Sequence, residues 1–220
     1  MHWESAAVSW REALTAYQAI DDWEGQGRAR LGLADVLARL GRKTEAENNL
    51  FYMTGQGAFS RLLRARAHYQ LALLAAEKDR EQAGRWLAEA RQLCAPDCAH
   101  VSSFDNLEAR LSAARADWGM VERLTTGVLA RHEVVAAERS HALRLLAETQ
   151  FERGELVTAR ASIIQALTLD RELAEPEWLL EDYTLLGRIA AAIGDGVEQK
   201  DAAARIASLC RGAKLAGCGR

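Results

Sequence analysis

Apolar and small residues recur at helical spacing on both sides of Gly154, in the segment LRLLAETQFERGELVTARASIIQALTLD at residues 143–170. Spacings of three and four residues predict a helix on each side, and the glycine predicts a turn between the two helices. Ala159 supplies a small side chain where the helices must approach each other closely. Weaker copies of the pattern begin at Arg30 and at Tyr183. The chain is therefore predicted to consist of repeated helical hairpins.

Recurrence at ~34 residues resembles the tetratricopeptide repeat family, in which a helix of pattern W-x2-L-G-x2-Y is followed by one of pattern A-x3-F. The best copy matches by residue type, with Leu143, Leu146, Ala147 and Gln150 in the first helix and Ala159, Ile163 and Ala166 in the second. The resemblance implies an all-α fold, a right-handed α-solenoid of tetratricopeptide-like hairpins. Each hairpin of such an array buries its apolar face by stacking on its neighbours.

The register places a single array over residues 1–220. A half repeat at 2–22 precedes five hairpins, at about 25–57, 58–96, 102–133, 138–172 and 178–212. The last hairpin has extra residues after Gly194, which the alignment assigns to its turn.

Residues 2–22 resemble only the second helix of a repeat, because Ala6, Trp10 and Ala13 stand at the A-x3-F-x2-A spacing. The first helix of this repeat is absent, so we expect the array to be cut from a longer protein. The helix face of Ala6, Trp10, Ala13 and Tyr17 is then expected to lack a cover on one side. An uncovered apolar edge favours a homodimer through this face.

Composition agrees with a helical repeat protein, since only 2 of the 220 residues are proline and 49% are hydrophobic. A net charge of −3 gives no overall attraction to nucleic acid, and we expect no nucleic-acid partner. No apolar run approaches the ~18 residues that span a bilayer, so no transmembrane segment is expected in this chain.

Sequence motifs of catalysis and of cofactor binding are not found. Gly25 and Gly27 lack the third glycine of a nucleotide-binding loop. His132-Glu133 has Ala136 where a zinc protease needs its second histidine. We therefore expect neither an enzyme, nor a cofactor, nor a metal site.

The four cysteines are the chemically distinctive residues. Cys94 and Cys98 flank Pro96, which interrupts the helix and lets the chain turn back, and Cys210 and Cys218 form a second local pair near the C-terminus. Four cysteines allow three connectivities, of which the local one is the expected disulfide pattern, whereas in a reducing compartment reduced thiols are expected. A zinc site of Cys94, Cys98 and His100 is a further alternative, but it lacks a fourth ligand at recognisable spacing. Disulfides would indicate an oxidising compartment, so a periplasmic or envelope-associated location is slightly favoured over the cytoplasm.

The family resemblance implies that inward positions of the first helices form a concave groove that binds a protein or peptide segment. Carried over residue by residue, the groove positions are Arg28, Leu31, Asp35, Arg39, Arg66, Tyr69, Leu73, Asn106, Arg110, His141, Arg144, Glu148, Phe151 and Arg188. Several of them are arginines, whose planar fork suits carboxylates. An acidic partner segment is therefore one hypothesis, with Arg110 and Arg144 as its anchors. The alternative is that these arginines pair with acidic residues of the chain itself.

Two functions fit the sequence. The first is a non-catalytic scaffold that binds a protein segment in its groove. The second is a sensor or regulatory arm of a larger transcriptional regulator or signalling protein. The sequence alone does not choose between them.

Overall fold

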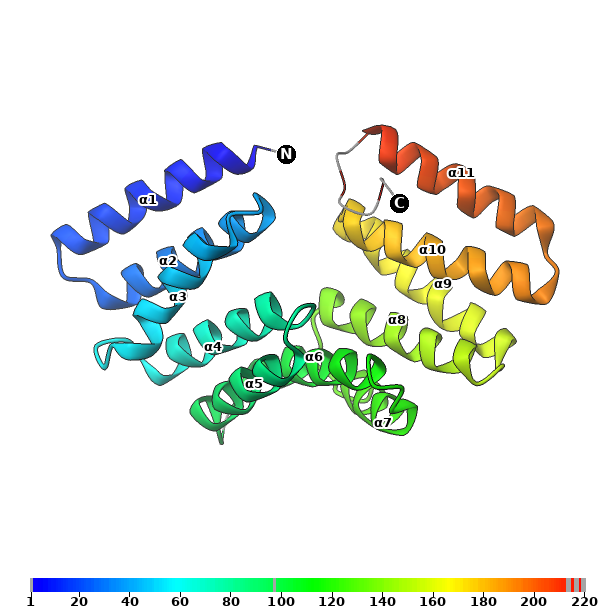
Figure 1. The fold of residues 1–220 in the computed structure, drawn as a ribbon, viewed down its shortest axis with the longest axis horizontal. Helices are drawn as coiled ribbons and strands as arrows, with labels where there is room; N and C mark the ends of the chain where they lie inside the picture. The colour runs from blue at the N-terminus through cyan, green and yellow to red at the C-terminus, as the bar shows by residue number, and fades with distance from the viewer. Residues whose placement is uncertain (1, 97, 213–214, 216–217, 219–220) are drawn as a thin grey trace. The chain divides into compact units, whose positions relative to one another are not determined.

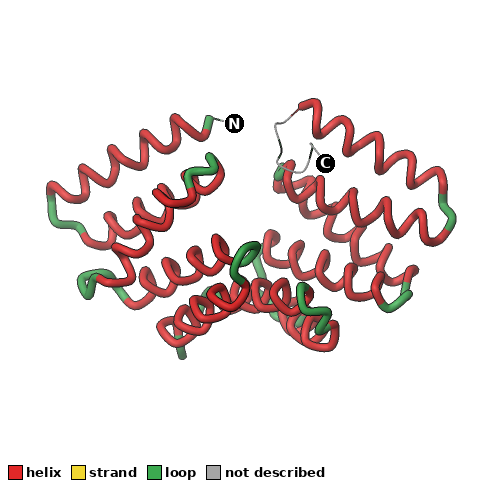
Figure 2. Tube along the Cα trace, in the orientation of Figure 1, coloured by secondary structure: helices red, strands yellow, loops and turns green. Residues whose placement is uncertain are grey.

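The computed structural model describes residues 2–96, 98–212, 215 and 218. Over these residues the fold is all-α, with eleven helices and no strand, and within each unit successive helices pack against each other (Figures 1 and 2). The helices are α1 (Trp3–Ala19), α2 (Trp23–Arg39), α3 (Lys43–Gly55), α4 (Arg61–Ala75), α5 (Arg80–Cys94), α6 (Val101–Ala113), α7 (Trp118–Leu129), α8 (Ala136–Glu152), α9 (Leu156–Leu173), α10 (Pro176–Ile193) and α11 (Gly196–Gly212). This arrangement is a helical repeat solenoid.

Each hairpin range expected from the sequence coincides with two successive helices to within about two residues, and α1 lies within the expected half repeat. The chain divides into two compact units, Met1–Phe104 and Asp105–Arg220, where the sequence suggested a single array. The two units are described separately below.

Glycines in a left-handed conformation follow three of the first helices. Gly41, Gly154 and Gly194 have φ of 75°, 78° and 79°, after α2, α8 and α10. A left-handed residue turns the chain sharply at the end of a helix, and glycine adopts this conformation without a steric penalty. In the hairpin of α6 and α7 an alanine, Ala116, takes the positive φ of 57°. In this hairpin, alanine thus takes the place that a turn glycine has in the other three.

The sequence alignment assigned the extra residues of the last hairpin to its turn, but the structure shows that they do not lengthen the turn. They form the first turn of α11, which begins directly after Asp195. Asp195 Oδ1 accepts hydrogen bonds from the backbone N–H groups of Val197 and Glu198, at 3.1 and 3.0 Å. An acidic side chain that caps the free N–H groups in this way starts a helix. Ala202 is consequently buried against α10, as its repeat position predicts.

Both cores consist of alternating large and small apolar residues. In the first unit, the core includes Leu37, Ala46, Leu50 and Met53, each at most 1% exposed. In the second unit, Ala159, Ile163 and Ala166 of α9 have no exposed surface. The alanines allow the helix backbones to approach, and the larger side chains fill the space between them.

The glycines of α2 serve close packing. A Cβ at Gly32 would lie 2.4 Å from the Trp10 ring, and one at Gly25 would lie 2.3 Å from the Tyr17 ring. Trp10 and Tyr17 of α1 therefore rest directly on the backbone of α2. One side of the α1 face is thus covered by α2, whereas Trp10 stays 36% exposed, and homodimerisation through this face stays a prediction from the sequence.

Both local disulfides are present in the structure. Cys94 bonds to Cys98 and Cys210 bonds to Cys218, with Cα atoms 5.0 and 5.4 Å apart. Among the described residues, no group of histidine, cysteine and acidic side chains has the arrangement of a metal site. A search of the same residues found no helix long and apolar enough to cross a membrane.

Replacing Gly32 by alanine should destabilise the first unit although alanine is the better helix former. The new methyl group would displace the Trp10 ring, at a cost of about 1–3 kcal/mol, which exceeds the gain of about 1 kcal/mol in helix propensity. Gly84→Ala in α5 is the matched control, because a Cβ there meets nothing within 4 Å. It should stabilise by about 0.5–1 kcal/mol. Urea unfolding followed by circular dichroism measures both changes, and a stabilising Gly32→Ala would contradict the packing argument.

The cysteine pairing predicts that protein purified without reductant has no free thiol. Thiol titration after unfolding should give none before reduction and four after it, and peptide mapping should place each bond locally. Four reactive thiols in the unreduced protein would refute both bonds and remove their support for an oxidising compartment.

Candidate partner-binding faces

In the first unit, the predicted groove positions lie along α2 and α4, which pack against each other. We call this surface the α2–α4 face; it comprises Asp35, Ala38 and Arg39 of α2 and Arg66, Gln70, Leu73 and Leu74 of α4. Gln70 joins the two helices, because its Nε2 donates a hydrogen bond to the backbone oxygen of Leu31 at 3.3 Å. Leu31 itself is 2% exposed and belongs to the core, so its predicted place in the groove is wrong.

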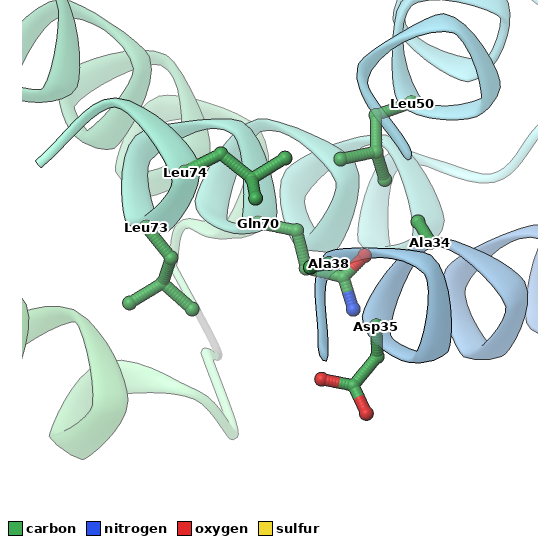
Figure 3. A pocket seen from close by; sticks show the side chains of 7 residues that line it. All are labelled: Ala34, Asp35, Ala38, Leu50, Gln70, Leu73 and Leu74. Atoms are coloured by element: carbon green, nitrogen blue, oxygen red, sulfur yellow. The ribbon is translucent and has the colours of Figure 1, made fainter. Parts of the chain in front are cut away.

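A small hollow opens on the α2–α4 face (Figure 3). Its volume is about 70 Å³, and its lining residues are Ala34, Asp35, Ala38, Leu50, Gln70, Leu73 and Leu74. Leu50 forms part of the buried floor, whereas Leu73 is 36% exposed. In Figure 3, the side chains of Asp35 and Leu73 extend to the same side, one from each helix. The hollow therefore combines an apolar floor with a polar and an apolar residue at its rim.

Gln70, which lines this hollow, carries an unused acceptor. Its Oε1 is shielded from solvent and has no hydrogen-bond partner among the described residues. A buried carbonyl oxygen without a partner is unfavourable, so a donor that enters the hollow would be stabilised by it. The sequence analysis did not select Gln70, since it lies one residue beyond the predicted Tyr69.

Most charges of this face are paired within α2. Arg28 contacts Glu24 at 3.2 Å and Arg39 contacts Asp35 at 3.3 Å, both one helical turn apart. Arg39 also lies over the Trp3 ring, with 4.8 Å from its Cζ to the ring centroid. Arg66 differs from them, because none of the described residues forms an ion pair with it. Tyr69 packs its ring on Phe104, at 5.3 Å between centroids.

In the second unit, the predicted positions on α8 and α10 contact each other across the seam between the two helices. We call this surface the α8–α10 face; it comprises His141, Arg144, Glu148 and Phe151 of α8 and Trp178, Glu181, Asp182 and Arg188 of α10. His141 stacks edge-on against Trp178 at 4.5 Å between ring centroids. At the other end, Arg188 lies over the Phe151 ring at 4.6 Å and pairs with Glu152 at 3.1 Å.

Arg144 is the centre of the α8–α10 face. Its Nε donates to Asp182 Oδ1 at 2.5 Å, its Nη2 to Asp170 Oδ2 at 2.5 Å, and its Nη1 to Glu181 Oε2 at 2.9 Å. The Arg144 side chain is only 13% exposed, and those of Asp170 and Asp182 have no exposed surface. The predicted role of Arg144 as an anchor for an external carboxylate does not fit this geometry, because internal carboxylates already occupy its guanidinium.

Burial shifts the pKa values of the groups around Arg144. It raises the pKa of Asp182 to about 7, although the adjacent Arg144 acts in the opposite direction. It lowers the pKa of His141 to about 4, and the positive charge of Arg144 lowers it further. Burial would lower the pKa of Arg144 itself, but the carboxylates of Asp182 and Glu181 raise it above its ordinary value. The pKa of Glu148 is raised by burial, against the effect of Arg188.

The two remaining predicted positions lie on α6. Asn106 is buried, and its Nδ2 donates to the backbone oxygen of Glu138 at 2.8 Å and to its Oε2 at 2.7 Å. It therefore joins α6 to α8 and does not face a partner. Arg110 is exposed, and none of the described residues forms an ion pair with it. Of the two predicted anchors, Arg110 alone is available.

No protein-family model matches the chain, and no curated protein matches its sequence. Among solved structures, the fold is similar to that of BtubC (BKLC) from P. vanneervenii, with a TM-score of 0.65. The match covers 96% of this chain and 92% of that one, at 15% sequence identity. The likeness shows the fold alone. The assignment of the hairpins to the tetratricopeptide family stays a prediction from the sequence.

The sequence analysis missed both buried carboxylates that hold Arg144. Acidic residues usually lie on solvated helix faces, and the sequence analysis named neither Asp170 nor Asp182. A signal was nevertheless present, because Asp170 falls one helical turn after Ala166, a predicted core position of the second helix. An acidic residue that shares a helix face with buried apolar residues is expected to pair with a basic side chain.

Arg144→Leu should destabilise the second unit by about 3–5 kcal/mol at neutral pH, because it leaves Asp170 and Asp182 buried without their cation. Arg188→Leu is the matched control on the same face. The Arg188 side chain is 50% exposed, so loss of its contact with Glu152 should cost no more than about 1 kcal/mol. Urea unfolding followed by circular dichroism compares the two, and equal small effects would show that the Arg144 cluster contributes no more than a surface pair.

Proposed function

We propose that this protein is a non-catalytic scaffold that binds an extended segment of another protein on its α2–α4 face. The hollow between α2 and α4 carries this proposal, because it combines an apolar floor, the unused Gln70 oxygen and the exposed Leu73. Its size of about 70 Å³ is well below the ~300–1,000 Å³ of typical small-molecule pockets. It suits a single aliphatic side chain of a partner.

The polar groups of the face define how such a segment would bind. A backbone N–H of the segment would donate to Gln70 Oε1, which would satisfy this oxygen. The aliphatic side chain would contact Leu73 and Leu74 and would be held mainly by burial of apolar surface.

Arg66 adds a preference for acidic residues in the partner. It precedes Leu73 by seven residues on α4, a distance of about 10.5 Å along the helix axis. Three residues of an extended chain span about the same distance, at ~3.3 Å each. The expected segment therefore has an acidic residue three positions from its aliphatic anchor. This retains the acidic partner expected from the sequence but replaces Arg144 by Arg66 as its contact.

The α8–α10 face supports a structural role for its titratable groups. The residues with the most displaced pKa values there, His141 and Asp182, contact other side chains of the chain, and Asp182 has no exposed surface. A catalytic acid or base needs access to a substrate. We therefore include the absence of catalysis in the proposal.

The proposal predicts the outcome of a selection from a random phage-displayed peptide library on the immobilised full chain. Enriched peptides should carry Asp or Glu three positions from Leu, Ile, Val or Met. Leu73→Glu should weaken a selected peptide about tenfold or more, because it places a charge at the apolar rim, and a tenfold change corresponds to about 1.4 kcal/mol. Arg66→Glu should weaken it by repulsion of the acidic residue.

Ile20→Glu is the control for this experiment. Ile20 is 71% exposed and belongs to the same unit, but it lies outside the α2–α4 face, in the turn before α2. Its replacement should leave peptide affinity unchanged. Selected peptides that bind Leu73→Glu and Arg66→Glu as tightly as the original protein would show that the binding face lies elsewhere.

A further inference from the structure

Two fully buried carboxyl groups meet at the junction of α8, α9 and α10. Asp170 lies near the end of α9, and Asp182 lies in the second turn of α10. Arg144 of α8 reaches both: its Nε donates to Asp182 and its Nη2 donates to Asp170, each at 2.5 Å. The three helices are thus joined by one guanidinium between two acidic side chains.

The second oxygen of each carboxyl group is not satisfied by any described donor. Asp170 Oδ1 and Asp182 Oδ2 are both shielded from solvent and have no hydrogen-bond partner. Nε and Nη2 lie on one edge of the Arg144 guanidinium, so the two carboxyl groups that they hold lie side by side. Two ionised carboxylates in contact would repel each other and would leave two buried oxygens without donors. A single proton between them would remove both costs.

We propose that Asp170 and Asp182 share one proton, held between Asp170 Oδ1 and Asp182 Oδ2, and that this carboxyl–carboxylate pair makes the junction of α8, α9 and α10 sensitive to pH. With one proton, the pair carries a single negative charge, which the single positive charge of Arg144 balances. Loss of the proton leaves two buried negative charges beside one cation and weakens the contact between the helices.

The neighbouring charges agree with this protonation. Besides Arg144, α8 contributes His141, whose Nδ1 lies 3.3 Å from Arg144 Nη1. Its lowered pKa of about 4 leaves it neutral near pH 7, so it supplies no second cation. Glu181 of α10 contacts the outer Nη1 of Arg144 and adds negative charge. Glu138 and Arg110 act on His141 from further along α8 and from α6, with opposite signs.

The direction of the pH effect follows from the unfolded state. Unfolded aspartate has a pKa of about 4, whereas burial raises that of Asp182 to about 7 in the folded chain. The folded state therefore holds more protons than the unfolded state between these values, and stability falls as pH rises through that range. His141 acts oppositely, since its lowered pKa makes stability fall as pH drops below about 6.5. A test must separate the two groups.

The direct test is a ¹³C NMR titration of aspartate side-chain carboxyl carbons in the full chain. We expect a titration with a midpoint near pH 7 that Asp182→Asn and Asp170→Asn each abolish. Because the two groups are coupled, the midpoint belongs to the pair. Asp201→Asn is the control, since Asp201 is an exposed α11 residue 3.6 Å from Arg205. It should leave that titration unchanged.

The second test compares melting temperatures of the original protein and Asp182→Asn as pH is raised from about 5 to about 8.5. An asparagine amide at position 182 can donate to Asp170 Oδ1 while its oxygen accepts from Arg144, so it replaces the shared proton. The melting temperature of Asp182→Asn relative to the original protein should rise by more than about 4 °C over this range. The His141 contribution is present in both proteins and cancels in the comparison.

Two outcomes would overturn the proposal. One is a titration in which no aspartate carboxyl of the original protein changes protonation above pH ~5.5, a result that needs no variant and holds even where a variant fails to fold. The other is a difference in melting temperature between Asp182→Asn and the original protein that stays constant over the pH range. The control Asp201→Asn should give such a constant difference.

Discussion

Each helix of this chain has an apolar face that its neighbours must cover, and this dependence on the adjacent helix governs the structure. Ala159 and Ala166 have no exposed surface because the neighbouring helices pack closely against α9. In α2, Gly25 and Gly32 fulfil the same condition for the rings of Tyr17 and Trp10. In such arrays, stability is approximately a sum of hairpin and nearest-neighbour terms. The close contacts between successive helices are therefore where small residues are required.

The contacts between successive first helices differ in the two units, and the difference decides what each face can do. Between α2 and α4 the contact is largely apolar and leaves a hollow beside Leu73. Between α8 and α10 the centre of the contact is charged, and Arg144 fills it with ion pairs. Buried charges bring a desolvation penalty that their attraction offsets only with good geometry. The α8–α10 face is thus committed to internal pairing, whereas the α2–α4 face keeps surface for a partner.

The candidate site could be predicted from the sequence only in part. Helical periodicity places Asp35 and Arg39 on one side of α2 and Arg66 and Leu73 on one side of α4, because side chains four and seven residues apart share a helix face. It could not distinguish Arg66 from Arg144. Both arginines stand at inward positions, but only Arg144 meets carboxylates from the two following helices. That difference depends on contacts between residues 26 and 38 positions apart.

The sequence by itself determined the helical class and indicated where helices and local cysteine pairs would lie, because these depend on spacings within about one repeat of the chain. Helical periodicity, turn glycines such as Gly154 and the short Cys94–Cys98 separation are all local features. The tertiary structure decided which polar side chains are exposed, where the α2–α4 hollow lies and which carboxyl groups adjoin Arg144. Burial and ionisation depend on the distances between helices, and one turn of helix is enough to move an acidic residue from solvent into the contact between two helices.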